Sequence, residues 1–205
     1  MKNKISKREM LGLTVGAAVS GISAPANAVL QCTAFNYQGI RQCDAGIRSS
    51  VANVFALNQR STNWCWAACL EMVFRYNGYY VQQSRIVRET YGNIYDWPAQ
   101  PQTILRQINR QWNDDNGRRF YVSGNSYSAN EITAAQDLSN NYPLIIGTLG
   151  HAMLLTNLTY LVDVYGRGIV QRAVVRDPWM NRGRRVLSAQ EWYSTSFLAR
   201  VRVQR

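Results

Sequence analysis

The hydrophobic pattern of this chain changes at Pro143, and this change limits the folds that the chain can adopt. Before it, apolar residues recur with the spacing of amphipathic helices; after it, short apolar runs alternate with turn sequences. We expect helices over 65–76, 82–91, 102–112 and 130–140, strands over 144–149, 152–164, 168–176, 184–187 and 197–203, a short helix over 188–194, and an extended arm over 29–58. This order predicts an α+β fold with a helical N-terminal lobe and an antiparallel β lobe, and a cleft between two lobes is a common place for an active site.

The first 28 residues have the three parts of an export signal. Four basic residues lie between positions 2 and 8, a mildly apolar stretch covers residues 10–22, and Ala26-Asn27-Ala28 is an A-x-A cleavage sequence. Ser6-Lys7-Arg8 resembles a twin-arginine signal with lysine in the first basic position, so Sec and Tat export both stay open. An amphipathic N-terminal helix is the alternative. We predict a signal peptide over 1–28 and one mature domain over 29–205, exported to the periplasm or secreted.

The charge of the predicted mature chain comes from arginine alone. Residues 29–205 hold 19 arginines, no lysine and 11 acidic residues, a formal net charge of +8. The arginines are dispersed except at Arg118-Arg119 and from Arg182 to Arg185, and neither cluster alternates with aromatic residues. We interpret both clusters as solvated surface that steers acidic partners. Because these clusters lack that alternation, we expect no nucleic-acid partner. No apolar run reaches the roughly 18 residues of a membrane span, so we expect no membrane insertion once the signal is removed. We also expect a monomer.

The four cysteines fall into two pairs. Cys32 and Cys43 lie eleven residues apart just after the cleavage sequence, and in an oxidising compartment they are natural disulfide partners. Cys65 and Cys69 would lie one turn apart on a helix, a poor position for a disulfide, and we interpret Cys69 as a buried small hydrophobic residue. With one histidine in the chain, a zinc site is improbable, and we expect no metal and no other cofactor.

Cys65 opens a run with helical periodicity, and Ser61-Thr62-Asn63 just upstream are favourable N-cap residues. A thiol in the first turn of a helix feels the positive end of the helix dipole, which favours the nucleophilic thiolate. Gln59 lies six residues upstream of Cys65, where a turn could return its amide toward the sulfur. That amide and the backbone N–H of Cys65 would form an oxyanion hole. The sequence therefore predicts Cys65 as nucleophile and Gln59 as oxyanion donor.

A cysteine nucleophile needs a base, and the base needs a third group that orients it. His151 is the only histidine, and it stands at the start of an apolar strand pattern. Asp177 ends another strand pattern and precedes Pro178-Trp179, where the tryptophan could shield the carboxylate from water. Asp163, inside a strand pattern, and Glu191, in a surface-like helix, fit this third position less well.

These residues resemble, in order, the active-site segments of papain-like cysteine peptidases. Gln59-x5-Cys65-Trp66-Ala67 is similar to their glutamine and nucleophile block, His151-Ala152 to their histidine strand, and Asp177-Pro178-Trp179 to their Asn-Ser-Trp segment with Asp in place of Asn. The fuller block Asn63-Trp64-Cys65-Trp66-Ala67-Ala68 is similar to bacterial secreted and effector-type members that use Cys, His and Asp. The resemblance spans about residues 47–203 and implies a papain-like two-lobed fold. It also implies a Cys65–His151–Asp177 triad with Gln59 at the oxyanion.

The function that this resemblance implies is hydrolysis of peptide bonds in a protein or peptide substrate by a secreted bacterial cysteine endopeptidase. Two other functions stay open on the sequence. A transglutaminase- or deamidase-like acyl transferase acting on glutamine would use the same triad, and a secreted binding module could keep the fold without catalysis. The presence of all four site residues argues against the binding module.

Overall fold

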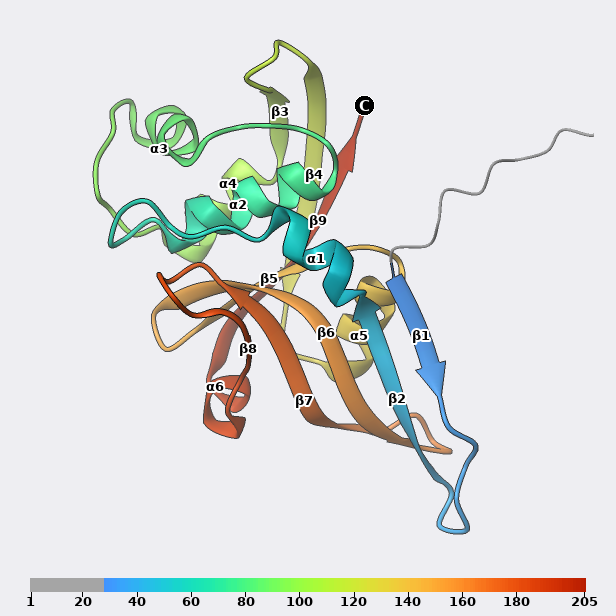
Figure 1. Cartoon of the computed structure of the whole chain (residues 1–205). Helices are drawn as coiled ribbons and strands as arrows, with labels where there is room; N and C mark the ends of the chain where they lie inside the picture. The colour runs from blue at the N-terminus through green and yellow to red at the C-terminus, as the bar shows by residue number, and fades with distance from the viewer. Residues whose placement is uncertain (1–27) are drawn as a thin grey trace, which may run out of the picture.

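The strands of the described chain form one sheet, with helices packed against it (Figure 1). The structure is a computed structural model that describes residues 28–205. Its strands are β1 (Ala28–Cys32), β2 (Ile40–Ile47), β3 (Arg110–Asn113), β4 (Arg119–Tyr127), β5 (Leu144–Thr148), β6 (His151–Asp163), β7 (Gly168–Asp177), β8 (Gly183–Val186) and β9 (Thr195–Gln204). Its helices are α1 (Ser49–Phe55), α2 (Cys65–Tyr76), α3 (Gln83–Tyr91), α4 (Pro101–Gln107), α5 (Glu131–Ser139) and α6 (Ala189–Tyr193). The expected α+β class is confirmed.

The sheet is antiparallel and centres on β6. The strand order is β1-β2-β6-β5-β9-β4-β3, while β7 pairs with β6 and β8 pairs with β7. Strand β6 has thirteen residues, so its first part pairs with β5 and its last part with β2, and β7 pairs along much of its length. Elements far apart in the sequence therefore meet on one strand that begins at His151.

The predicted signal peptide, residues 1–28, lies outside the described residues except for Ala28, the first residue of β1. The predicted disulfide is confirmed: Cys32 and Cys43 are directly opposite each other in the β1–β2 pair, with their sulfur atoms 2.00 Å apart. Within residues 28–205, no helix is both long enough and apolar enough to cross a membrane.

The N-terminal half contains more strand than its sequence pattern indicates. The segment expected to be an extended arm contains α1 and the β1–β2 hairpin, which joins the sheet through β6. The helix expected over 102–112 ends at Gln107, and Trp112 lies in strand β3. The periodicity misled because Trp112 follows Ile108 by four residues, a spacing that fits a helical face as well as one face of a strand. Trp112 is buried there against Phe74, with its indole N–H bonded to the Gln107 carbonyl.

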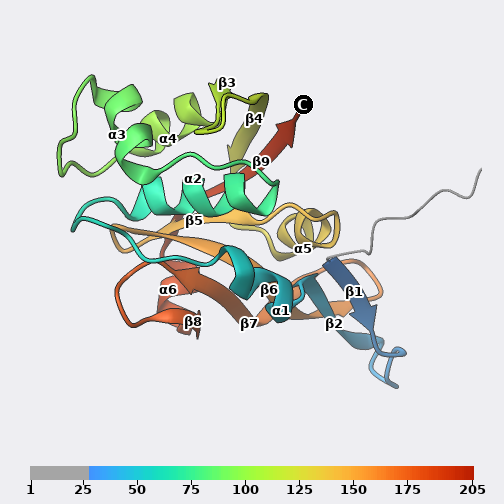
Figure 2. The ribbon, with the colours of Figure 1, turned by 45° about the horizontal axis from the view of Figure 1, so that its top comes forward.

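Helix α2 lies in the middle of the molecule, between helices α3 and α4 on one side and strands β5 and β6 on the other (Figure 2). Every residue from Trp66 to Phe74 is buried. A helix that is buried on all sides is a core helix, and here the one charged residue of the buried run, Glu71, is paired with Arg75 of the same helix. Small residues such as Ala67 and Ala68 let the neighbouring elements approach the helix. The core therefore fixes the direction and position of α2, and with them the position of its first residue, Cys65.

Candidate active site

Cys65 is the first residue of α2, as its sequence position predicts. The residue before it, Trp64, occupies the N-cap position, and no side chain in the described chain caps the helix from there, contrary to the expectation for Ser61-Thr62-Asn63. The first N–H groups of a helix lack intrahelical partners. The start of α2 therefore offers backbone donors beside the Cys65 thiol, which is partly exposed.

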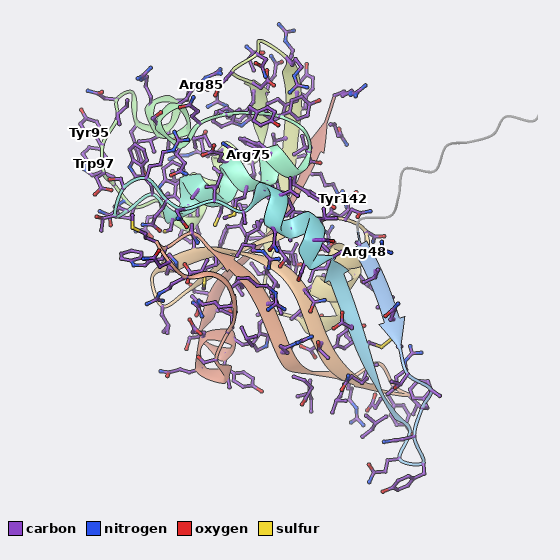
Figure 3. All side chains as sticks on the ribbon, viewed as in Figure 1. Arg48, Arg75, Arg85, Tyr95, Trp97 and Tyr142 are labelled. Atoms are coloured by element: carbon purple, nitrogen blue, oxygen red, sulfur yellow. A yellow bond between two sulfur atoms is a disulfide. The ribbon has the colours of Figure 1, made fainter. Side chains whose placement is uncertain are left out.

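The segment that leads into Cys65 is held by the loop between α3 and α4. The Asn63 N–H donates to the Asp96 carboxylate at 2.8 Å, and the indoles of Trp64 and Trp66 donate to backbone carbonyls of the same loop. Figure 3 labels Tyr95 and Trp97, which lie on this loop at the edge of the molecule. These bonds hold the segment that leads into α2 and therefore the position of Cys65.

His151 is placed by a tight turn between β5 and β6. Thr148 pairs with His151, and the two residues between them, Leu149 and Gly150, have φ angles of 50° and 78°. Two consecutive positive φ values fit a two-residue hairpin turn, and a leucine in this conformation is strained. Such strain is often found next to functional groups. The turn brings the imidazole, at the first position of β6, to the edge of the sheet beside Cys65.

Asp177 is the last residue of β7, the neighbour of β6, and its side chain is fully buried. Its Oδ1 lies 2.7 Å from His151 Nε2 and also accepts the Trp179 N–H at 2.9 Å. The Trp179 ring packs edge-on to the imidazole, with centroids 6.0 Å apart. Three residues from three elements, Cys65, His151 and Asp177, are thus brought together in the order that the sequence predicts.

The contacts of the imidazole shift two pKa values in opposite directions. Burial disfavours the charged ring of His151, but hydrogen bonds and charge interactions with Asp177 and Cys65 outweigh it and raise its pKa to about 9. Burial likewise disfavours the Asp177 anion, but bonds from His151, the Trp179 N–H and Arg185 outweigh it and lower its pKa to about 2. Between these values the pair consists of an imidazolium and a carboxylate.

Cys65 and His151 face two adjoining cavities, of about 480 Å³ and about 210 Å³. The larger one continues past His151 toward charged side chains of the segment 179–191, and the smaller one is lined mainly by apolar groups near Trp66 and Phe197. Pro98 and Thr148 line both. The two cavities therefore meet at the thiol and the imidazole.

The side chain of Gln59, six residues before Cys65, is buried, and its amide holds the loop that connects the two residues. Its Nε2 donates to the carbonyls of Ser61 at 2.9 Å and Thr62 at 2.6 Å, while its Oε1 has no partner among residues 28–205. Its backbone N–H donates to the Pro178 carbonyl at 2.7 Å, which ties this loop to the segment after Asp177. In this conformation both amide hydrogens are used within the loop, and Gln59 lines a cavity beside the one that holds Cys65.

Two site residues have roles that the sequence did not indicate. Arg185 belongs to a cluster interpreted as solvated surface, yet its side chain is only 21% exposed. Its guanidinium binds Asp177 Oδ2 at 2.7 Å and the Glu191 carboxylate at 2.7 Å. Glu191, considered as an orienting carboxylate for His151, contacts Arg185 instead. A charged cluster shows no periodicity, so its sequence does not separate a solvated arginine from one that faces inward.

Cys69 lies one turn beyond Cys65 and is fully buried, as expected for a small hydrophobic residue. Burial, and then the charges of Cys65 and Asp177, raise the pKa of its thiol well above the usual value. Within residues 28–205, no group of three or more His, Cys, Asp or Glu side chains is arranged to hold a metal ion. The groups that face one another at the site are the Cys65 thiol, the His151 imidazole and the Asp177 carboxylate.

Comparison with known proteins gives a family match over most of the chain. The model of the Peptidase C39-like family matches residues 51–201, a range that contains Gln59, Cys65, His151 and Asp177. A comparison with curated proteins gives no match. One similar solved structure is the crystal structure of a double glycine motif protease from an AMS/PCAT transporter in complex with the leader peptide. It is 17% identical, with a TM-score of 0.47, and the match covers 73% of this chain and 89% of that chain.

Proposed function

Because this chain belongs to the Peptidase C39-like family and is a cysteine peptidase, we propose that it is an exported endopeptidase that uses Cys65, His151 and Asp177. The observation that carries this proposal is the line of side chains from Cys65 through His151 to the buried Asp177, at the junction of two cavities. A thiol, a base and a group that orients the base are the parts that nucleophilic catalysis requires.

In the proposed reaction, the Cys65 thiolate attacks the carbonyl carbon of the scissile peptide bond. The negative charge that develops on the carbonyl oxygen is stabilised by backbone N–H groups at the start of α2. His151 then donates its proton to the leaving amine, which departs as the new N-terminus, and the acyl group stays on the sulfur. A water molecule, deprotonated by His151, releases the acyl group as a carboxylate. Asp177 keeps the imidazole oriented and stabilises its charge throughout.

The cavities support a peptide substrate on geometric grounds. We place the part of the substrate after the cleaved bond in the larger cavity, near Trp179, whose ring packs against the imidazole that protonates the leaving amine. The part before the bond lies in the smaller, more apolar cavity, near Trp66 and Phe197. A site open on both sides of the nucleophile suits cleavage within a chain.

Gln59 is our candidate for the second oxyanion donor, once its amide rotates away from the carbonyls of Ser61 and Thr62. If it acts on the oxyanion, Gln59→Ala lowers kcat by on the order of 100-fold and leaves KM nearly unchanged. If it only holds the loop, the same change raises KM and lowers the melting temperature, and kcat falls little. Steady-state kinetics together with thermal unfolding separate these roles.

The test of the proposed reaction uses the protein from Val29 onward and a mixture of unrelated peptides, with new termini identified by mass spectrometry. We expect Cys65→Ala and His151→Ala each to abolish cleavage. The matched control is Cys69→Ala, which removes the other free thiol one turn away and should retain cleavage. Cleavage that persists in Cys65→Ala refutes the proposal. Release of ammonia from glutamine side chains without new termini would assign the site to acyl transfer instead.

The proposed export depends on the predicted signal over residues 1–28. The disulfide between Cys32 and Cys43 supports it, because such bonds persist in oxidising compartments. Expression of the full chain in a bacterium should yield a processed protein outside the cytoplasm whose first residue is Val29. Blocking the Sec and Tat pathways one at a time identifies the route, and an unprocessed cytoplasmic product contradicts the proposal.

A further inference from the structure

Asp177 uses only one of its two oxygens to contact His151. The other, Oδ2, accepts a hydrogen bond from Arg185 Nε at 2.7 Å, and the exposed Arg182 lies farther away, with its Nη1 3.8 Å from the same oxygen. The two remaining nitrogens of the Arg185 guanidinium donate to both oxygens of Glu191, at 3.0 Å and 2.7 Å. A continuous chain of charged groups therefore runs from His151 through Asp177 and Arg185 to Glu191, and its last two members line the larger cavity.

The fold holds these charged groups in place. Arg185 lies in β8 opposite Val175 of β7, two residues before Asp177. Glu191 forms a capping box with Ser188 at the start of α6, where each side chain bonds the other's backbone N–H. The Glu191 carbonyl also accepts the Thr148 hydroxyl at 2.6 Å, at the turn that precedes His151. The turn that carries the imidazole and the helix that carries Glu191 are thus joined directly.

The burial of Asp177 gives this arrangement a physical reason. A carboxylate with no solvent exposure needs donors on both oxygens, and a single imidazole satisfies one of them. Arg185 supplies the missing donor and fixes the rotation of the carboxylate, so that Oδ1 points at His151. An unbalanced cation at this position would compete for the carboxylate and disfavour the imidazolium. Glu191 balances that cation, and its own pKa falls to about 2 chiefly because of its bonds from Arg185.

We propose that Arg185 and Glu191 are positioning residues for the reaction: Arg185 orients the Asp177 carboxylate toward His151, and Glu191 neutralises Arg185 so that Asp177 keeps its full effect on the imidazole. The proposal deepens the function proposed above and rests on it for its kinetic readout. Through Asp177, the charges of Arg185 and Glu191 shift the pKa of His151 in opposite directions. Removing the cation of Arg185 raises the pKa of His151, whereas removing the anion of Glu191 lowers it.

The experiment measures the pH dependence of kcat/KM for Arg185→Met, Arg185→Lys and Glu191→Gln. We expect the alkaline limb to move up by roughly one pH unit in Arg185→Met and down by roughly half a unit in Glu191→Gln. We also expect kcat at the optimum to fall at least about tenfold in Arg185→Met with little change in KM, because the carboxylate loses its orientation. Arg185→Lys keeps the charge without the guanidinium fork and should restore the wild-type limb but only part of kcat.

The matched control is Arg184→Met, at the residue next to Arg185 on β8. Arg184 is exposed, and within the described residues its side chain bonds the Ser49 hydroxyl and no carboxylate. The profile of this variant should coincide with that of the wild type. The rate of Cys65 alkylation by iodoacetamide, measured over the same pH range in every variant, reports the same titration without a substrate. This second readout separates failure of the positioning proposal from failure of the proposed peptidase function.

The proposal is overturned if Arg185→Met and Glu191→Gln, both folded by circular dichroism, move the alkaline limb in the same direction or leave it at the wild-type pH. A purely structural role would lower activity and melting temperature without opposite shifts. Should Arg185→Met fail to fold, Glu191→Gln decides alone, because it keeps Arg185 and an acceptor for the Ser188 N–H. An unshifted limb in that variant then rejects the proposal.

Discussion

Replacing Asp177 by asparagine should remove the charge that keeps His151 protonated while nearly preserving the shape of the side chain. In the wild type the pKa of His151 is about 9, and the ordinary value for the residue is about 6.5. Without the Asp177 anion the pKa should fall, and if the two effects that remain, burial and Cys65, cancel each other, it returns to about 6.5. At pH 7.5 the protonated fraction of the ring would then drop from about 97% to about 9%, roughly tenfold, whereas at pH 5.5 it would fall only from about 100% to about 91%.

The assay is the pH dependence of kcat/KM for Asp177→Asn and wild type on one peptide. The ratio of wild-type to variant activity should be about tenfold larger at pH 7.5 than at pH 5.5, in addition to any loss that is independent of pH. The alkaline limb should move down by about 2.5 units. Alkylation of Cys65, followed by mass spectrometry, should show the same shift, with buried Cys69 as an internal reference that labels slowly.

The matched control is Asp163→Asn, which removes a carboxylate from the far end of β6, where it binds Arg167 at the surface. Its pH profile should equal that of the wild type. Thermal unfolding of Asp177→Asn verifies the fold, since the change also takes a buried partner from Arg185. If the folded variant keeps the wild-type alkaline limb and loses activity equally at all pH values, Asp177 does not set the protonation of His151, and the electrostatic argument fails.

Three further predictions concern stability. Changing Cys32 and Cys43 together to alanine should lower the free energy of unfolding by about 2–3 kcal/mol in urea titrations and leave kcat/KM unchanged, since Cys43 pairs with Tyr160, far along β6 from the site. Phe74→Ala should lower the free energy of unfolding by about 3–5 kcal/mol, because the ring is fully buried against two other aromatic rings; a loss below about 1 kcal/mol would contradict this packing. The melting temperature should be highest between about pH 4 and pH 6.5. The raised pKa of His151 contributes stability that is lost as pH rises through about 9. The lowered pKa of Asp177 contributes stability that is lost as pH falls through about 2. A melting temperature that is flat up to pH 10 would refute the contribution of His151.

Local signals in the sequence were sufficient for part of the fold and for the chemistry of the site. The start of α2 at Cys65, the strand that begins at His151 and the strand that ends at Asp177 each follow from nearby apolar spacing and turn residues. The disulfide follows from the short separation of its two cysteines. These features depend on interactions within a few residues, which a single sequence displays directly.

The tertiary structure decided which distant groups share the site and in what orientation. Nothing near Arg185 in the chain distinguishes it from a solvated arginine; it binds Asp177 because β8 pairs with β7 in one particular register. The amide of Gln59 faces the carbonyls of its own loop, and Trp112 joins a strand rather than a helix, because packing against the rest of the protein overrides local preference. Local preferences are worth tenths of a kcal/mol per residue, whereas burial of a side chain and pairing with distant strands are worth several kcal/mol. The sequence therefore determined the elements and the reactive groups, and the assembled sheet determined how they meet.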